Sequence, residues 1–218
     1  MNKLVVFSFF LVLSSSALVA QPSQYSFVFL HKKSDADQIS KEKLDKLMEG
    51  HMANINRLAS EGKLIAAGPF EGGGGIFVLN TTSVPEARQW LSTDPGIQAN
   101  RWNVEILPYT PRLGGVCAVK EPYEMTNYTF IRFDAIVNKE TAPTYPHIIK
   151  RHDDYIKQIV ASGNLVTEGI FGENEGGILV IKGDLQPEVI ESDPGVQEGL
   201  LHFQIKKLFI AKGAFCER

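Results

Sequence analysis

Two histidines and two aspartates of this chain have the side chains and the spacing needed for acid–base chemistry. His51 is followed by Asp94, and His152 is followed by Asp193 at nearly the same separation. An imidazole titrates near neutral pH, and a carboxylate beside it fixes its tautomer and stabilises its charged form. The sequence therefore predicts that His51, Asp94, His152 and Asp193 are catalytic residues that transfer a proton.

Each of these residues also has a structural interpretation. A histidine on the apolar face of a helix is commonly a hydrogen-bonded core residue. Both aspartates precede Pro-Gly, and an aspartate at such a place caps a short helical turn that begins with proline. Recurrence favours a function for the histidines, because an ordinary core position requires only some apolar residue. The sequence leaves both interpretations open.

The histidines belong to an internal repeat of about 100 residues. The stretch Gly62–Phe70, GKLIAAGPF, returns as GNLVTEGIF at Gly163–Phe171, and DPGIQ at Asp94–Gln98 returns as DPGVQ at Asp193–Gln197. A period of this length is that of a whole small domain, whereas solenoid repeats run to roughly 20–50 residues. The sequence therefore predicts two copies of one domain.

The chain divides into a leader, two domains and a linker. Lys3 is followed by an apolar run and small residues, which is the layout of a secretory signal, and the run is too short to span a bilayer. Cleavage after Ala20 or Ala17 would export the protein to the periplasm or out of the cell; an uncleaved anchor is the alternative. We expect a signal peptide at 1–20, a first domain at 21–109, a linker at 110–123 and a second domain at 124–218.

Both copies have the same predicted order of elements. In the first copy, a strand at Tyr25–His31 precedes a helix that Ser40 caps, and two strands, a helix and a strand follow. Apolar residues at spacings of three and four place His51 on the apolar face of the first helix. The order β-α-β-β-α-β is that of a ferredoxin-like unit. In the second copy, the second helix is shorter by about one turn.

The strand sequences indicate that both faces of each sheet are buried. FVFL at Phe27–Leu30 and ILVI at Ile178–Ile181 are apolar throughout, whereas a half-solvated strand alternates. Helices cover one face of such a sheet, so the sheet of the other copy is expected to cover the second face. We predict an α+β fold of two four-stranded sheets, packed face to face or closed as a barrel, with the helices outside.

The charge balance indicates a small-molecule or protein partner. The chain has 22 basic and 25 acidic residues, and loss of Lys3 with the leader leaves a formal net charge of −4. The sequence has neither the basic stripe of a nucleic-acid binder nor the cationic helix of a membrane-surface protein. It also has no metal-ligand spacing, dinucleotide fingerprint or P-loop lysine. We therefore expect no metal and no cofactor, and we interpret Gly72–Gly75 as a hairpin loop.

Two cysteines, Cys117 and Cys216, end the two copies at matching positions, each shortly after a glycine. Equivalent residues of two related copies can meet near the axis between them, and an exported chain enters an oxidising compartment. We predict a disulfide between Cys117 and Cys216. Two free thiols or an intermolecular bridge are the alternatives.

The combined pattern resembles the YciI-like (YCII-related) domain family. A histidine on the first helix, an AGPF stretch, a glycine loop and a later DP motif are similar to the family over Tyr25–Tyr109, and more loosely over Tyr128–Leu208. The resemblance implies a dimeric α+β barrel with a ferredoxin-like protomer, and an active site on the His–Asp pair of each copy. The second copy departs from the family in having Ile170 in place of the usual proline.

Two hypotheses follow for a chain of two ferredoxin-like repeats that form an intramolecular pseudo-dimer, with further oligomerisation left open. In the first, the protein is a lyase- or isomerase-type enzyme acting on a small organic molecule, and Gly68, Pro69 and Phe70 form a backbone wall for the ligand. In the second, it is a non-catalytic ligand-binding or assembly module with structural histidines. The first copy keeps Pro69 and the longer helix, so His51 with Asp94 is expected to be the better site.

Overall fold

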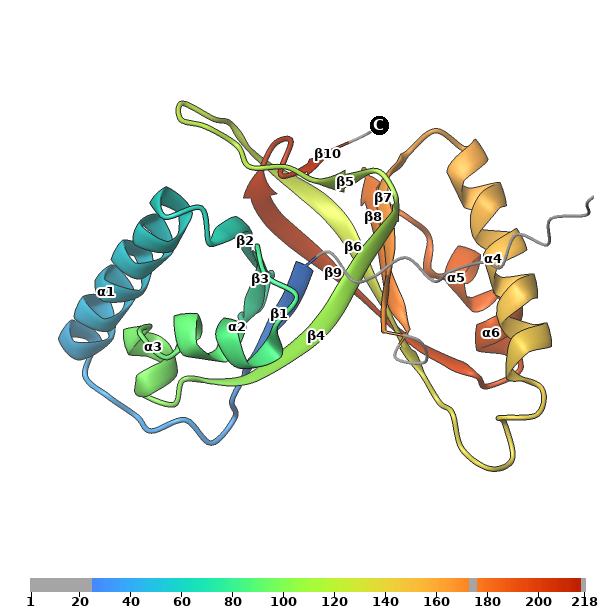
Figure 1. The fold of residues 1–218 in the computed structure, drawn as a ribbon, viewed down its shortest axis with the longest axis horizontal. Helices are drawn as coiled ribbons and strands as arrows, with labels where there is room; N and C mark the ends of the chain where they lie inside the picture. The colour runs from blue at the N-terminus through green and yellow to red at the C-terminus, as the bar shows by residue number, and fades with distance from the viewer. Residues whose placement is uncertain (1–24, 173–175, 217–218) are drawn as a thin grey trace, which may run out of the picture.

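A computed structural model describes residues 25–172 and 176–216 of the chain. The two copies lie side by side, with their strands between them and the helices of each copy on its outer side (Figure 1). None of the helices in these two ranges is long and apolar enough to cross a membrane. The expected signal peptide at 1–20 lies outside the described residues.

The first copy has the predicted order of elements, with one short helix in addition. Its first helix begins after Ser40, whose Oγ accepts a hydrogen bond from the Lys43 amide, and Asp94 caps the additional short helix. The elements are β1 (Tyr25–Lys32), α1 (Lys41–Ser60), β2 (Leu64–Pro69), β3 (Gly75–Leu79), α2 (Val84–Leu91), α3 (Pro95–Gln98) and β4 (Trp102–Leu113).

The second copy repeats this order. Its second helix is shorter than that of the first copy, as predicted: α5 has 5 residues, whereas α2 has 8. The elements are β6 (Met125–Ala135), α4 (Tyr145–Ala161), β7 (Leu165–Phe171), β8 (Gly177–Lys182), α5 (Pro187–Glu191), α6 (Pro194–Gln197) and β9 (Leu201–Ala211). Two short strands, β5 (Gly115–Val116) and β10 (Phe215–Cys216), follow β4 and β9.

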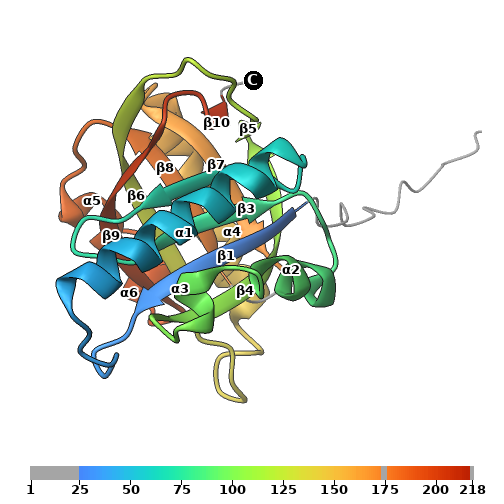
Figure 2. The same cartoon turned by 90° about the vertical axis from the view of Figure 1, so that its left-hand side faces the viewer.

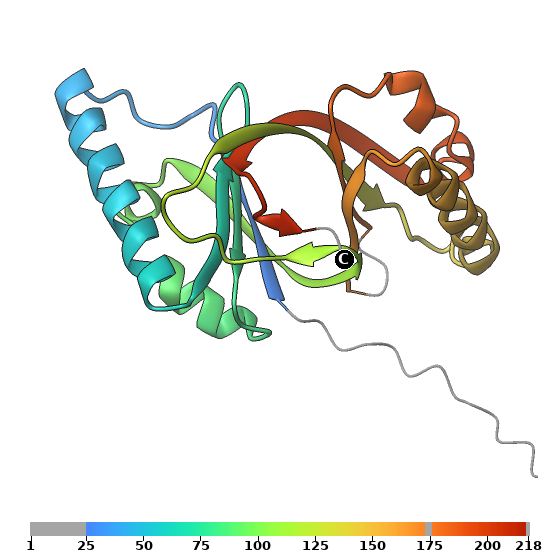
Figure 3. The same ribbon diagram turned by 90° about the horizontal axis from the view of Figure 1, so that it is seen from above.

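The long strands form one antiparallel eight-stranded sheet rather than two separate sheets. Its order is β2-β3-β1-β4-β7-β8-β6-β9, so each copy contributes four neighbouring strands, and β4 against β7 joins them. The two edge strands approach each other at a bridge between Phe70 and Leu208. Figure 3 shows the strands arranged around a common centre. The fold is of the predicted α+β class, with the sheet curled into a barrel.

Neighbouring residues of one strand pack on opposite faces of this barrel. Phe27 and Phe29 belong to the apolar cluster that fills the interior, whereas Val28 and Leu30 pack with residues of α1 and α2 on the outer face. Figure 2 shows the helices of the first copy lying over that outer face. Because successive side chains of a strand point to opposite faces, both sets must be apolar here. Each fully buried side chain of this size contributes roughly 1.5–3 kcal/mol to stability.

The segment expected to be a linker, 110–123, is partly built into the sheet. Residues 110–113 continue β4 and pair with β7. The first residue of β1, Tyr25, pairs with Tyr109. Beyond Tyr109, the backbone groups of β4 therefore form their hydrogen bonds with the second copy. After this extension, β5 pairs with β10, and Cys117 and Cys216 form the predicted disulfide. Val116 of β5 belongs to the interior cluster, so this paired ending closes one end of the barrel.

Four ionisable side chains lie together at the opposite end of the barrel. Arg132 on β6 donates hydrogen bonds to Glu105 on β4, through Nη1 at 2.7 Å and Nη2 at 2.9 Å, and its Nε donates to Asp134 at 2.6 Å. Nε2 of His31 lies 2.6 Å from Oε2 of the same glutamate. Hydrogen bonds from Arg132 and then from His31 lower the pKa of Glu105 to about 2. The cluster therefore connects β1 and β4 of the first copy to β6 of the second.

Candidate functional site

The structure brings His152 and Asp193 together. His152 is one of the buried residues of α4, and its Nδ1 lies 2.7 Å from Oδ2 of Asp193. The aspartate is fully buried, and its Oδ1 accepts a hydrogen bond of 2.7 Å from the Gly195 amide at the start of α6. The sequence left open whether this aspartate caps a helix or contacts the histidine. The structure shows that it does both.

His51 and Asp94 repeat this geometry with additional partners. Nδ1 of His51 lies 2.7 Å from Oδ2 of Asp94, which is also fully buried. Oδ1 accepts hydrogen bonds from the amides of Gly96 at 2.8 Å and Ile97 at 3.2 Å. Oδ2 accepts a further hydrogen bond of 3.2 Å from Nδ2 of Asn54. Each oxygen of this carboxylate therefore has two hydrogen-bonding partners.

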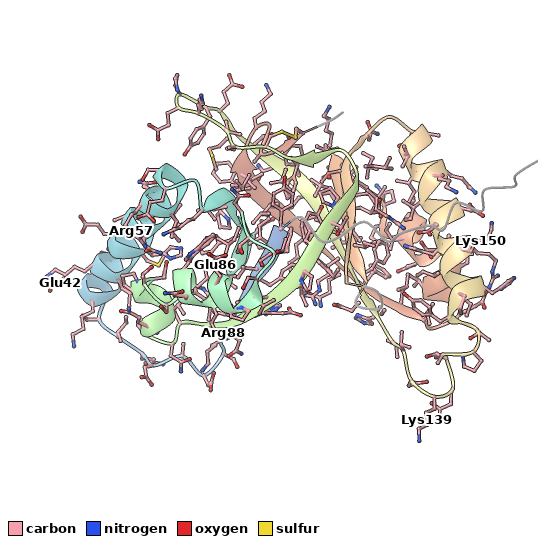
Figure 4. The ribbon with its side chains drawn as sticks, viewed as in Figure 1. Glu42, Arg57, Glu86, Arg88, Lys139 and Lys150 are labelled. Atoms are coloured by element: carbon pink, nitrogen blue, oxygen red, sulfur yellow. A yellow bond between two sulfur atoms is a disulfide. The ribbon has the colours of Figure 1, made fainter. Side chains whose placement is uncertain are left out.

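Asn54 marks a difference between the copies. It follows His51 by three residues, and the same position after the second histidine holds Tyr155, whose hydroxyl donates instead to the Val189 carbonyl at 2.7 Å. Arg57, labelled in Figure 4, donates a hydrogen bond of 2.9 Å to Oδ1 of Asn54. The first copy therefore holds its carboxylate in a larger network of polar side chains than the second copy does.

Aromatic rings pack against both histidines. The ring of His51 lies 5.9 Å from that of Phe77 in a stacked arrangement, and 4.8 Å from that of Trp102. The ring of His152 has Phe133 edge-on at 5.1 Å. Contacts with two large rings contribute packing energy at His51.

A cavity of about 200 Å³ lies beside His152. Its polar lining includes Arg112, Asp153 and Glu168. Arg112 is part of β4, so the first copy contributes to a cavity that otherwise belongs to the second. The apolar residues of the lining include Phe133, Ile149, Leu179 and Leu201.

The charged residues of the cavity form a hydrogen-bonded cluster. Nε of Arg112 donates to Glu168 at 2.8 and 3.1 Å, and its Nη2 donates to Glu168 at 2.5 Å and to Asp153 at 2.8 Å. Burial alone would lower the pKa of Arg112, but the hydrogen bonds and charges of Glu168 and Asp153 outweigh it and raise the pKa. Within residues 25–172 and 176–216, no group of three or more His, Cys, Asp or Glu side chains could hold a metal ion.

The cavity lies at the copy that the sequence did not favour. His51 with Asp94 was the pair expected to be the better site, yet this cavity is lined by His152. A second cavity, of about 540 Å³, is lined by residues that include Pro69 and Phe70 and contains neither histidine in its lining. The expectation relied on a proline and on helix length, whereas the position of the 200 Å³ cavity depends on side chains from both copies.

The residues predicted to bind a ligand are divided between two places. Pro69 and Phe70 line the second cavity. Gly68 lies where β2 passes β9, and a Cβ there would be 2.6 Å from the carbonyl oxygen of Phe209, so its lack of a side chain is explained by strand packing. In the second copy the residues that match Gly68 and Pro69, Gly169 and Ile170, line the cavity beside His152.

Sequence reasoning missed the charged cluster. Glu168 stands where the first copy has Ala67, and Asp153 stands where it has Met52. A comparison of the copies position by position, made for charge rather than for identity, would have found both carboxylates. Arg112 gave no such signal, because it lay in the segment interpreted as a linker.

Comparisons with known proteins found a family model that matches the first copy, and solved structures that are similar to the chain. No curated protein matched the chain. Two solved structures, each described as a candidate monooxygenase, have similar folds. One is from Lactobacillus acidophilus NCFM, with 14% identity and a TM-score of 0.42 over 85% of this chain and 92% of that one. The other is from Fusobacterium nucleatum, with 11% identity and a TM-score of 0.45 over 86% and 92%. Residues 26–110, which include His51 and Asp94, match the model of the YCII-related domain, and the first copy is therefore similar to that family.

Proposed function

We propose that this protein is an exported small-molecule enzyme of the lyase or isomerase type, in which His152 transfers a proton and Asp193 orients its ring. The observation that carries the proposal is that one side chain combines two properties. His152 is held at 2.7 Å by a fully buried carboxylate, and it also lines a cavity of about 200 Å³. A general base requires both an orienting partner and access to a substrate.

In this proposal each ring nitrogen of His152 has its own role. Nδ1 of His152 is engaged by Asp193, so Nε2 is the nitrogen that would accept a proton from a ligand in the cavity. The carboxylate would then stabilise the imidazolium ion that forms. In an isomerase the proton returns to another carbon of the substrate; in a lyase the electron pair of the broken C–H bond expels a leaving group. A positioned general base contributes typically about 10²–10⁴-fold to the rate.

The two copies together would form an intramolecular pseudo-dimer of the dimeric α+β barrel type. The pairing of β4 with β7 supports this proposal, as does the Phe70–Leu208 bridge between β2 and β9. Arg112 adds a functional reason for the arrangement, because the second copy alone would lack this part of its cavity.

For His51 and Asp94 we propose a structural role, which corresponds to the non-catalytic alternative restricted to the first copy. Asp94 has Asn54 as an additional partner, and the His51 ring packs against Phe77 and Trp102. A buried network that is fully hydrogen-bonded makes the local structure rigid. The first copy would then serve chiefly to complete the barrel and to provide Arg112.

The test is base-catalysed ring opening of 5-nitrobenzisoxazole, in which removal of a proton from carbon breaks the N–O bond and releases a coloured phenolate. We expect the wild-type protein to accelerate the reaction, His152→Asn to abolish the acceleration, and His51→Asn to retain it. His51→Asn is the matched control, because His51 also lies on the first helix of its copy and is also held at 2.7 Å by a buried carboxylate. Equal rates for the three proteins would contradict the proposal, and loss only in His51→Asn would transfer the site to the first copy.

A further inference from the structure

The charged residues of the cavity are specific to the second copy. The repeat aligns Glu168 on β7 with Ala67 on β2, and Asp153 next to His152 with Met52 next to His51. Glu168 is 5% exposed, so a buried carboxylate occupies a position where the other copy has a methyl group. The same backbone therefore accepts either an ionised or an apolar side chain at this place.

Arg112, near the end of β4, is also a charged residue whose matching position in the repeat holds an alanine. It precedes Gly114 by two residues, and Ala211 precedes Gly213 by two residues at the end of β9. The positions of Arg112 and Glu168 in one half of the barrel thus correspond to those of Ala211 and Ala67 in the other half. A partly buried ion pair costs desolvation energy and is often no more stabilising than apolar residues. Because alanines occupy the matching positions in the other half of the barrel, the fold itself does not require the charged cluster.

The cluster leaves the cavity with an excess of negative charge. Arg112 carries one positive charge, and Glu168 and Asp153 carry one negative charge each. The guanidinium is already engaged by both carboxylates through Nε and Nη2. The side chain of Asp153 is 33% exposed, so it is open to a ligand as well. An anion entering the cavity would meet net repulsion, whereas a cation would meet carboxylate oxygens held in place by Arg112.

We propose that the cavity beside His152 binds a small organic cation, with an ammonium or amidinium group against Asp153 and Glu168. The apolar part of the cation lies against Phe133 and Ile149, which also line the cavity. Arg112 acts as a positioning residue, because it orients the two carboxylates from the neighbouring copy. The inference deepens the proposed function and rests on it, since the cation is the substrate class on which His152 acts.

Three probes of nearly equal size and different charge test this inference: benzylammonium, benzyl alcohol and benzoate. Binding to the wild-type protein is measured by NMR titration of backbone amides. We expect benzylammonium to bind at least about tenfold more tightly than benzoate, which is about 1.4 kcal/mol, with benzyl alcohol between them. Tighter binding of benzoate, or no binding of benzylammonium at millimolar concentration, would overturn the proposal.

Two variants establish that the cluster causes the preference. Asp153→Asn removes the excess charge while keeping the size of the side chain, and it is expected to reduce the preference for benzylammonium several-fold. Asp154→Asn is the matched control, because Asp154 is the next residue of α4, is paired with Lys150 and Lys157, and does not line the cavity. It should leave all three affinities unchanged. Equal effects of the two substitutions would show that the ligand preference depends only on the total charge of α4 and not on the cavity, which contradicts the proposal.

A third variant separates this inference from the proposed function. His152→Asn should lose the ring opening of 5-nitrobenzisoxazole and keep the preference for benzylammonium over benzoate. Proton transfer without a charge preference in the wild type would overturn the ligand class alone. A charge preference without His152-dependent proton transfer would overturn the enzyme proposal and leave a cation-binding cavity.

Discussion

The amide of Asn54 donates a hydrogen bond to Oδ2 of Asp94, the same carboxylate oxygen that holds His51. Tyr155 at the corresponding position of the second copy donates elsewhere, to a backbone carbonyl. The two His–Asp pairs have equal separations of 2.7 Å, so their distances alone do not distinguish them. The two pairs differ in the other residues that contact the carboxylate and the imidazole ring.

Asn54→Ala should destabilise the first copy and change the environment of its histidine. The substitution removes one donor to Asp94 and leaves Arg57 without its contact to the Asn54 carbonyl. We expect a loss of about 1–2 kcal/mol in the free energy of unfolding, measured by urea denaturation. The Nδ1–H resonance of His51 should move, because its acceptor oxygen loses a competing donor. Tyr155→Phe is the control and should leave the resonance of His51 in place; a stationary resonance in Asn54→Ala would refute the coupling.

Gly96→Ala should cost more than the equivalent Gly195→Ala. A Cβ on Gly96 would lie 2.2 Å from Cζ3 of Trp102, a large ring with little freedom to move. A Cβ on Gly195 would lie 2.6 Å from Cδ1 of Leu201, the end of a flexible side chain. We expect about 1–3 kcal/mol of destabilisation for Gly96→Ala, and a smaller loss for Gly195→Ala. Thermal or urea unfolding of the two variants checks this order, and the reverse order would show that the tryptophan ring can shift freely.

Removal of the disulfide should destabilise the whole barrel. Cys117 and Cys216 are separated by 99 residues, and closing a loop of this length contributes up to about 4.7 kcal/mol in the chain-entropy model. The double variant Cys117→Ser with Cys216→Ser should unfold at lower urea concentration, and reductant should shift the wild type but not the variant. A variant as stable as the oxidised wild type would show that the paired strands β5 and β10 hold this end of the barrel without it.

Acid should weaken the ionic cluster at the other end of the barrel. The pKa of Glu105 is about 2 in the folded protein, below its usual value near 4.5, because Arg132 and His31 hydrogen-bond to its carboxylate. A carboxyl group with a lowered folded pKa stabilises the protein above its unfolded pKa, and that stabilisation is lost as the pH falls from about 4.5 through 2.

The variant Glu105→Gln measures this contribution. It should be less stable than the wild type at pH 6, and the difference between the two proteins should shrink as the pH is lowered from 5 toward 2. The contribution is modest because the side chain of Glu105 is 33% exposed and solvent screens it. Parallel pH profiles for the two proteins would show that Arg132 stabilises the folded state through Asp134 alone.

Much of the fold follows from local patterns in the sequence. Ser40 begins α1 as predicted, and the apolar spacing correctly places His51 on its buried face. FVFL at Phe27–Leu30 correctly indicates a strand buried on both sides. These features depend on periodicity and on capping, which a single sequence records.

The site was less predictable, because it depends on contacts between distant segments. Comparison of the repeats identified His152 and Asp193, yet nothing local to Arg112 indicates that it reaches the second copy. Its segment contains Pro and Gly and was interpreted as a linker, whereas pairing of β4 with β7 makes it part of a strand. Tertiary pairing of backbone groups overrode the local composition.

The presence of two similar halves in one chain has a consequence for how their sequences can change. In an assembly of identical subunits, a two-fold axis applies every substitution twice, so a new charge in one site appears in the other. Here Glu168 and Ala67 occupy matching places but are encoded separately. A substitution at one of these positions therefore leaves the other unchanged, so one half of the barrel can hold an apolar residue where the other half holds a charged one.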